Sequence, residues 1–216
     1  KRQEHIVIEE GITGIGSEAF AGFVKVLSVN IPYTVKKIKR NSFENNYRLR
    51  EIQIPNEVIS IGDKAFAGCH GLKNLSLPSK LNYVGSFEFC KNIKSIILPD
   101  STKDTADGMF TGCEMLTSVK LPRKLKAIKA YDFADCRKLT KLNIPVTVKV
   151  VYMSAFAGSG LKKIVLPSNV QKIRNGNDGQ KVFEYIKGIG YPTKNLRVIE
   201  IHSKKVKSIQ KNSFSG

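Results

Sequence analysis

The sequence predicts a β-rich solenoid in which repeats of about 23 residues stack in register. Two regular columns of residues predict this fold class. Phenylalanine recurs every 23 residues, with one interval of 21, and a proline follows each of these phenylalanines after twelve residues, or eleven in the last repeat. The columns are Phe20, Phe43, Phe66, Phe87, Phe110, Phe133 and Phe156, and Pro32, Pro55, Pro78, Pro99, Pro122, Pro145 and Pro167. A unit this short cannot bury its apolar side alone, so a fixed period of this length indicates units that share one continuous core.

The segment before each proline has the pattern of a short strand. It carries two apolar residues two positions apart, as in Leu75 and Leu77. Residues with this spacing point to the same side of a strand, so their neighbours Asn74 and Ser76 must face outward. Proline has no N–H for a further ladder bond and therefore ends the strand. Stacked repeats then predict a parallel ladder sheet with one strand from each repeat.

A second extended segment follows each proline. Its apolar residues lie three positions apart, as in Val58 and Ile61, and a short turn then leads to the Ala-Phe of the next repeat. This pattern predicts a second face made of short strands. The whole chain, residues 1–216, is expected to form a single solenoid domain.

Three departures from the repeat are expected to disturb it locally. Residues 100–107 replace apolar positions with Thr102, Asp104 and Thr105, which predicts a looser turn. The repeat that leads to Phe87 is two residues shorter than the others. From 174 to 195 the spacing breaks, which predicts an irregular insertion before the fold resumes with residues such as Val198 and Ile209.

The complete repeat resembles a known family. The pattern Ala-Phe-x-x-Cys-x-x-Leu-x-x-Ile-x-Leu-Pro, clearest from Ala65 to Pro78, is similar to the BspA-type leucine-rich repeat of bacterial surface proteins. The resemblance implies a leucine-rich-repeat solenoid. It also implies a secreted or cell-surface protein, and several members of this family are implicated in adhesion to host proteins or to other bacteria.

The charge balance favours an anionic partner. Lys and Arg number 36 against 18 Asp and Glu, and the formal net charge is +18. Such a charge attracts anions over long range, and salt weakens the attraction. Acidic proteins, acidic glycans, anionic lipid and nucleic acid all meet this condition, and a merely hydrated lysine-rich surface is the alternative. Nucleic acid is disfavoured because few aromatic residues are interleaved with the basic clusters.

No export signal or membrane-spanning segment is expected within this sequence. No apolar run approaches the roughly 18–20 residues that a span needs. The chain opens with Lys1-Arg2-Gln3, which we interpret as the start of an internal or processed fragment. The protein is expected to be monomeric.

The cysteines and histidines do not suggest an enzyme or a metal site. Four cysteines share one column, which places their Cα atoms about 5 Å apart in stacked strands: Cys69, Cys90, Cys113 and Cys136. That distance permits a disulfide, but parallel side chains suit one poorly, so we expect buried free thiols and keep one or two bridges as the alternative. There is no Cys-x-x-Cys and no histidine array for a metal. His5, His70 and His202 lie in different repeats without catalytic partners, so neither catalysis nor a cofactor is predicted.

The outward positions of the ladder strands are the candidate binding surface, because they all point to one side. This surface is neutral and polar in the early repeats and becomes basic in its C-terminal half. The candidate ligand-binding residues on it are Ile97, Lys120, Lys141, Lys163 and Val165, and Lys73 and Lys94 run directly beside it. The lysines would attract an anionic ligand, and the two apolar side chains stand where water is expected. An ordinary hydrated face is the alternative for this surface.

The sequence therefore predicts a non-enzymatic interaction or adhesion module that binds a protein or an acidic glycan on a host or neighbouring cell. Two other functions stay open. The repeats could serve only as a structural spacer in a larger surface protein, or form a basic nucleic-acid-binding solenoid.

Overall fold

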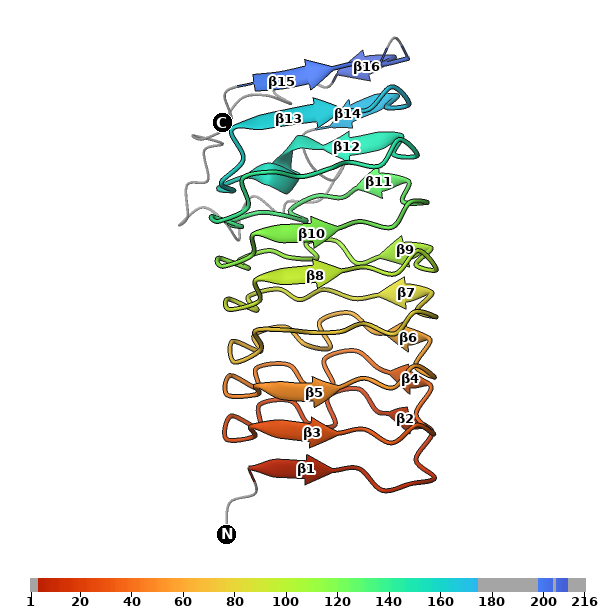
Figure 1. Ribbon diagram of the computed structural model, residues 1–216, viewed down its shortest axis with the longest axis vertical. Coiled ribbons are helices and arrows are strands. Elements are labelled where there is room, and N and C mark those ends of the chain that lie inside the picture. The colour runs from red at the N-terminus through yellow and green to blue at the C-terminus, as the bar shows by residue number, and fades with distance from the viewer. Residues whose placement is uncertain (1–3, 175–197, 204, 210–216) are drawn as a thin grey trace.

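The protein is a column of stacked coils, one for each sequence repeat. A computed structural model describes residues 4–174, 198–203 and 205–209. Figure 1 shows the coils piled from the N-terminal strand β1 (His5–Val7) to β15 (Val198–Ile201) and β16 (Ser208–Ile209). Along one side of the column the strands run in one direction, and along the other side shorter strands run back (Figure 1). The predicted parallel solenoid with two strand-bearing faces is confirmed.

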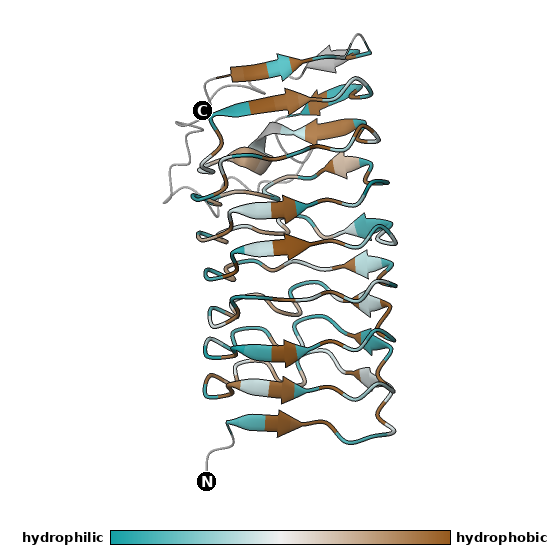
Figure 2. Cartoon of the chain, in the orientation of Figure 1, coloured by the Kyte–Doolittle hydropathy of each residue, from teal (hydrophilic) through white to brown (hydrophobic). Residues whose placement is uncertain are grey.

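The first side is the ladder sheet, and its strands pair in parallel with equivalent residues of adjacent coils opposite one another. Val29 lies beside Ile52, for example, exactly one repeat later in the chain. Besides β1 and β15 the strands are β3 (Ser28–Asn30), β5 (Glu51–Gln53), β8 (Ser95–Ile97), β10 (Ser118–Lys120) and β13 (Lys163–Leu166). The coil between β5 and β8 contributes a single bridge, Asn74 to Ser95. In Figure 2 the ladder strands contain both hydrophilic and hydrophobic residues, as expected for strands with one face in the core and one face exposed to solvent.

The second side consists of shorter parallel strands. A five-stranded sheet contains β2 (Gly14–Ile15), β4 (Lys37–Ile38), β6 (Ser60–Ile61), β7 (Tyr83–Val84) and β9 (Asp104–Thr105). A four-stranded sheet contains β11 (Ala127–Ile128), β12 (Val150–Tyr152), β14 (Lys172–Arg174) and β16. A 3-10 helix, η1 (Met153–Phe156), follows β12.

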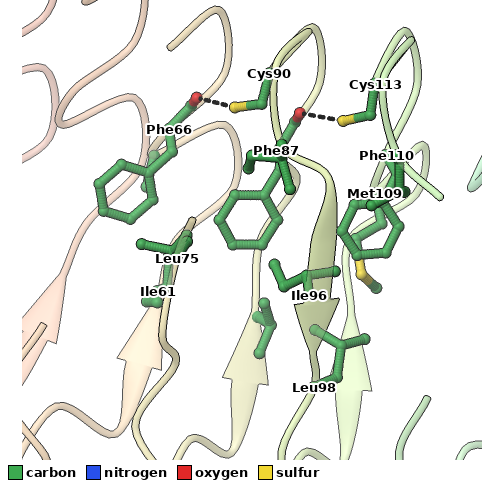
Figure 3. Packing of buried hydrophobic residues seen from close by; sticks show 14 of the residues in the cluster. Ile61, Phe66, Leu75, Phe87, Cys90, Ile96, Leu98, Met109, Phe110 and Cys113 are labelled. Carbon is green, nitrogen blue, oxygen red and sulfur yellow. Dashed lines mark hydrogen bonds between the residues drawn. The ribbon is translucent and has the colours of Figure 1, made fainter. Parts of the chain in front are cut away.

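The phenylalanine column forms a continuous stack through the core. Adjacent rings from Phe20 to Phe156 have centroids 5.3–6.1 Å apart and lie within 28° of parallel. Six of the seven rings are buried, and Phe20 is only partly covered. Figure 3 shows Phe66, Phe87 and Phe110 following one another from coil to coil. Each ring therefore loses its water through contact with the equivalent ring of the next coil.

The cysteine column hydrogen-bonds one coil to the next. The sulfur of Cys90 donates to the carbonyl of Phe66 at 3.0 Å, and that of Cys113 donates to Phe87 at 3.2 Å (Figure 3). Asn46 occupies the same column, and its Nδ2 donates to the carbonyl of Phe20 at 2.9 Å. In these coils the position holds a small donor that reaches the preceding coil. All four cysteines are buried and free, as expected.

The expectation of a loose turn at residues 100–107 is wrong. Asp104 and Thr105 form β9, which pairs with β7 in the regular register, although β9 contains only polar residues and is drawn in teal in Figure 2. Thr102 and Thr105 are buried at the positions that are apolar in other coils. Threonine is branched at Cβ like valine and fits the same strand position, so the shape of the side chain preserves the coil.

The two missing residues shorten the turn between β7 and Phe87. An added Cβ on Gly85 would lie 2.0 Å from the carbonyl oxygen of Gly62 in the preceding coil. Only glycine permits the backbones to approach this closely. The core phenylalanine thereby keeps its place in the stack despite the shorter turn.

The repeat resumes after the predicted insertion. Apart from Arg174, which ends β14, the segment 174–195 lies outside the described residues. Beyond it β15 pairs with β13, and β16 pairs with β14, in parallel register.

Thr102→Val should raise the free energy of unfolding by about 1 kcal/mol or more, because the buried Thr102 hydroxyl has no hydrogen-bond partner among the described residues. Thr147→Val is the matched control: its hydroxyl donates to the carbonyls of Arg123 and Leu125, so the same change should lower stability. Denaturant titration measures both. A Thr102→Val protein less stable than the parent would contradict the explanation.

The four native cysteines should not react with a thiolate-specific alkylating reagent at pH 8 until the protein unfolds. Burial raises the pKa of the Cys90 thiol to about 12 and raises the pKa values of the other three well above their usual range. Mass spectrometry before and after addition of denaturant checks this. Ser76→Cys, on the exposed ladder strand position, should react at once, and equal labelling of the native column would show that the thiols are accessible.

Candidate functional site

The seven predicted ligand-binding residues are all exposed on the ladder face, which we define as the outward side chains of the ladder sheet and of the equivalent unpaired segments, together with the exposed residue directly before each of them. Lys73 and Lys94 hold equivalent positions in consecutive coils. Ile97 on β8 lies directly beside Lys120 on β10, since the two are register partners. Ile97 is 62% exposed, so an apolar side chain stands next to a charged one on this face.

The C-terminal part of this face is less basic than the sequence suggested. The ammonium of Lys163 lies 2.7 Å from the carboxylate of Glu200, and His202 Nε2 lies 3.5 Å from its other oxygen. These neighbours lower the pKa of Glu200, with the hydrogen bond from Lys163 as the largest cause. Sequence reasoning missed Glu200, because the broken spacing before it hid its register with Val165.

A groove of about 920 Å³ opens on the N-terminal half of the ladder face. Of the seven predicted residues only Lys73 lines it. Outward side chains of β3 and β5 line it together with residues from the turn that precedes each ladder strand. We call this hollow the N-terminal groove.

An aromatic pair lies at the turn side of the N-terminal groove. The rings of Tyr47 and His70 have centroids 5.0 Å apart and are tilted by 37°. The amide Nδ2 of Asn92 donates to the backbone carbonyl of His70 at 2.8 Å, which ties the pair to the next coil. Burial lowers the pKa of His70, and nearby Lys91 adds to this effect, so the ring is mostly neutral at neutral pH.

Sequence reasoning overlooked this pair. Tyr47 and His70 stand four residues after the phenylalanine of consecutive repeats, and that shared column was the available signal. Tyr47 is 44% exposed, so one side of the pair is available to a ligand.

Most of the charged side chains that line the N-terminal groove are cationic and favour binding of an anion. Arg48, Arg50 and Lys73 line it together with a single carboxylate, Glu51. Arg48 already lies 3.8 Å from Glu4. Arg50 and Lys73 occupy the same column in consecutive coils, so their cationic groups start from adjacent strands.

A second hollow, of about 440 Å³, lies at the shortened turn, and both lysines that line it are paired with carboxylates. Lys129 contacts Asp104 at 3.1 Å and Asp107 at 3.7 Å, and its ammonium also donates to the carbonyl of Thr105. The Tyr83 hydroxyl donates to Asp63, and burial together with this bond raises the pKa of Tyr83. This network supports the polar coil at β9.

The described part of the chain holds no group of three side chains suited to a metal ion. No helix among the described residues is long and apolar enough to cross a membrane.

The stacked coils, the phenylalanine core and the outward-facing ladder define a leucine-rich-repeat protein. The chain belongs to the family with the BspA-type leucine-rich repeat region, whose model matches residues 1–89 and 85–190 with six copies. No curated protein sequence is significantly similar to the chain.

Solved bacterial structures share this fold. A leucine-rich repeat protein from T. pallidum is 28% identical, with a TM-score of 0.69 over 73% of this chain and 77% of that one. One from Bacteroides ovatus is 27% identical, with a TM-score of 0.64 over 95% and 62%. A leucine-rich cell surface protein from Faecalibacterium prausnitzii is 21% identical, with a TM-score of 0.58 over 92% and 59%, and shows the fold alone. The chain thus spans about three-fifths of the last two structures.

Proposed function

We propose that this protein is a non-enzymatic interaction module of the cell exterior, which binds a ligand carrying anionic groups through its ladder face. The observation that carries the proposal is the N-terminal groove together with the exposed cations that continue from it along the same face. A repeat scaffold presents such a face as one extended surface, because every coil adds one strand in the same orientation.

Charge and apolar contact would act together on this face. The net charge of +18 would draw an anionic ligand from a distance, while Lys94, Lys120 and Lys141 would contact it after docking. Ile97 is 62% exposed and offers an apolar contact beside Lys120, and Val165, which is 43% exposed, offers another beside Glu200.

The proposed extracellular location is supported by the family and by a related fold. The F. prausnitzii protein of this fold is described as a cell surface protein.

Charge reversal of the ladder face should remove ligand binding without changing the fold. The triple variant Lys94→Glu, Lys120→Glu, Lys141→Glu should weaken binding to captured anionic ligands by about tenfold or more, because three exposed ion pairs each contribute up to about 1 kcal/mol. A glycan and protein array followed by surface plasmon resonance, at two salt concentrations, measures this.

The control is a second triple variant with the same change of net charge, placed on the side of the column that carries the shorter strands: Lys37→Glu, Lys126→Glu, Lys149→Glu. It should keep binding within about threefold of the parent, since long-range attraction alone changes modestly in physiological salt. Equal losses in both triples would mean non-specific polyanion binding. A parent protein that captures no ligand from the array would favour the spacer, and a captured ligand that neither triple weakens would contradict binding through these lysines.

A further inference from the structure

The N-terminal groove combines three kinds of side chain that together fit a charged sugar. An aromatic pair, Tyr47 and His70, lies at the turn side, and two cations, Arg50 and Lys73, stand next to it. Beyond them lie the outward amides of the ladder strands: Asn30, Gln53 and Asn74. We propose that this groove binds an oligosaccharide that bears uronate carboxylates, which deepens and rests on the function proposed above.

The aromatic pair suits the flat apolar face of a sugar ring. Tyr47 presents an exposed ring that is buttressed by His70 at 5.0 Å, and the Asn92 bond to the His70 backbone holds that support in place. A tyrosine at a surface offers apolar area at one end and a hydroxyl at the other, so it can pack on C–H groups and hydrogen-bond to a sugar hydroxyl. Since His70 is mostly neutral, the pair acts as a packing surface and not as a further cation.

The cations stand where the carboxylates of such a ligand would lie. Arg50 and Lys73 are both exposed and line the groove. The planar guanidinium of Arg50 can bind a carboxylate with two parallel hydrogen bonds, whereas the Lys73 ammonium acts as a point charge. The side-chain amides both donate and accept, which matches sugar hydroxyls that do the same.

The spacing of the coils favours a sugar chain over an extended peptide. Equivalent side chains such as Arg50, Lys73 and Lys94 recur at the inter-strand spacing of about 4.8 Å along the column. An extended peptide that lies along the column presents side chains to one side only every two residues, about 6.7 Å, and loses register within a few coils. A linked pyranose unit is close to the coil spacing in length, so successive sugars could meet equivalent side chains.

Glu51 is the one carboxylate among the residues that line the groove. Removing its charge should strengthen binding of an anionic sugar, whereas loss of a purely structural side chain would not. The carboxylate repels a uronate at close range, although it can accept a hydrogen bond from a hydroxyl. Glu51→Gln keeps the size and the acceptor but removes the charge. It should therefore strengthen binding of the anionic sugar several-fold and leave a neutral sugar unaffected.

The experiment uses the whole chain and three defined probes of similar length: oligogalacturonate, a neutral cello-oligosaccharide and poly-glutamate. Isothermal titration calorimetry compares the parent with Tyr47→Ala and Arg50→Ala. Tyr33→Ala removes a tyrosine that is 65% exposed outside the groove, and Arg40→Ala removes an exposed arginine after β4. Circular dichroism and thermal unfolding establish that every variant is folded.

We expect oligogalacturonate to bind best, with a loss of about tenfold or more in Tyr47→Ala and in Arg50→Ala and of less than twofold in the two controls. Poly-glutamate that binds as well as the sugar, and that is insensitive to Tyr47→Ala, would overturn the assignment to a glycan and identify an acidic-peptide site. Absence of oligogalacturonate binding would overturn it as well.

The two proposals fail in different ways. Lys94, Lys120 and Lys141 lie outside the residues that line the groove. If their reversal abolishes binding of another ligand while the groove variants bind as the parent does, the ladder face retains its function and only the uronate site is wrong. If reversal of those lysines has no effect on any ligand while the groove variants lose oligogalacturonate, the uronate site stands and binding by the wider ladder face is wrong.

Discussion

Every coil of this protein depends on the next one for its core. A unit of about 23 residues buries one phenylalanine and a few aliphatic side chains, which is too little to offset the loss of chain entropy on its own. The stack of rings at 5.3–6.1 Å provides the shared interior, and the parallel strand ladders provide the backbone hydrogen bonds. The hydrogen bonds from the cysteine column to the preceding phenylalanine carbonyls connect the same coils a third time.

This dependence explains which irregularities the column tolerates. At β9 the apolar positions are threonines, and their shape keeps the stack in register even though a hydroxyl is left without a partner. At the shortened turn, Gly85 allows the backbone to approach Gly62 so that Phe87 stays between its neighbours. In both places the packing of the interior is preserved. At β9 a buried hydroxyl is left without a hydrogen-bond partner, and at the shortened turn the residue has to be glycine.

The same stacking makes the outer surface available for binding. Because the interior fixes the position of each ladder strand, the outward side chains can vary without disturbing the fold. One stretch of that surface has become a groove with an aromatic pair and cations, and a later stretch holds an exposed ion pair between Lys163 and Glu200. The ladder face is therefore not uniform: its hollow part lies near the N-terminus, and the basic character predicted for its C-terminal half is partly neutralised.

The sequence by itself determined the coils, the register of the ladder and the set of residues that face outward. Each of these follows from a spacing repeated along the chain, and a side chain two positions from another must lie on the same side of a strand. The aromatic pair of Tyr47 with His70, the groove and the contact between Lys163 and Glu200 were decided only in the tertiary structure. They depend on how individual side chains from neighbouring coils lean toward one another, and for Glu200 on a register that an irregular spacing concealed, so no repeated spacing specifies them.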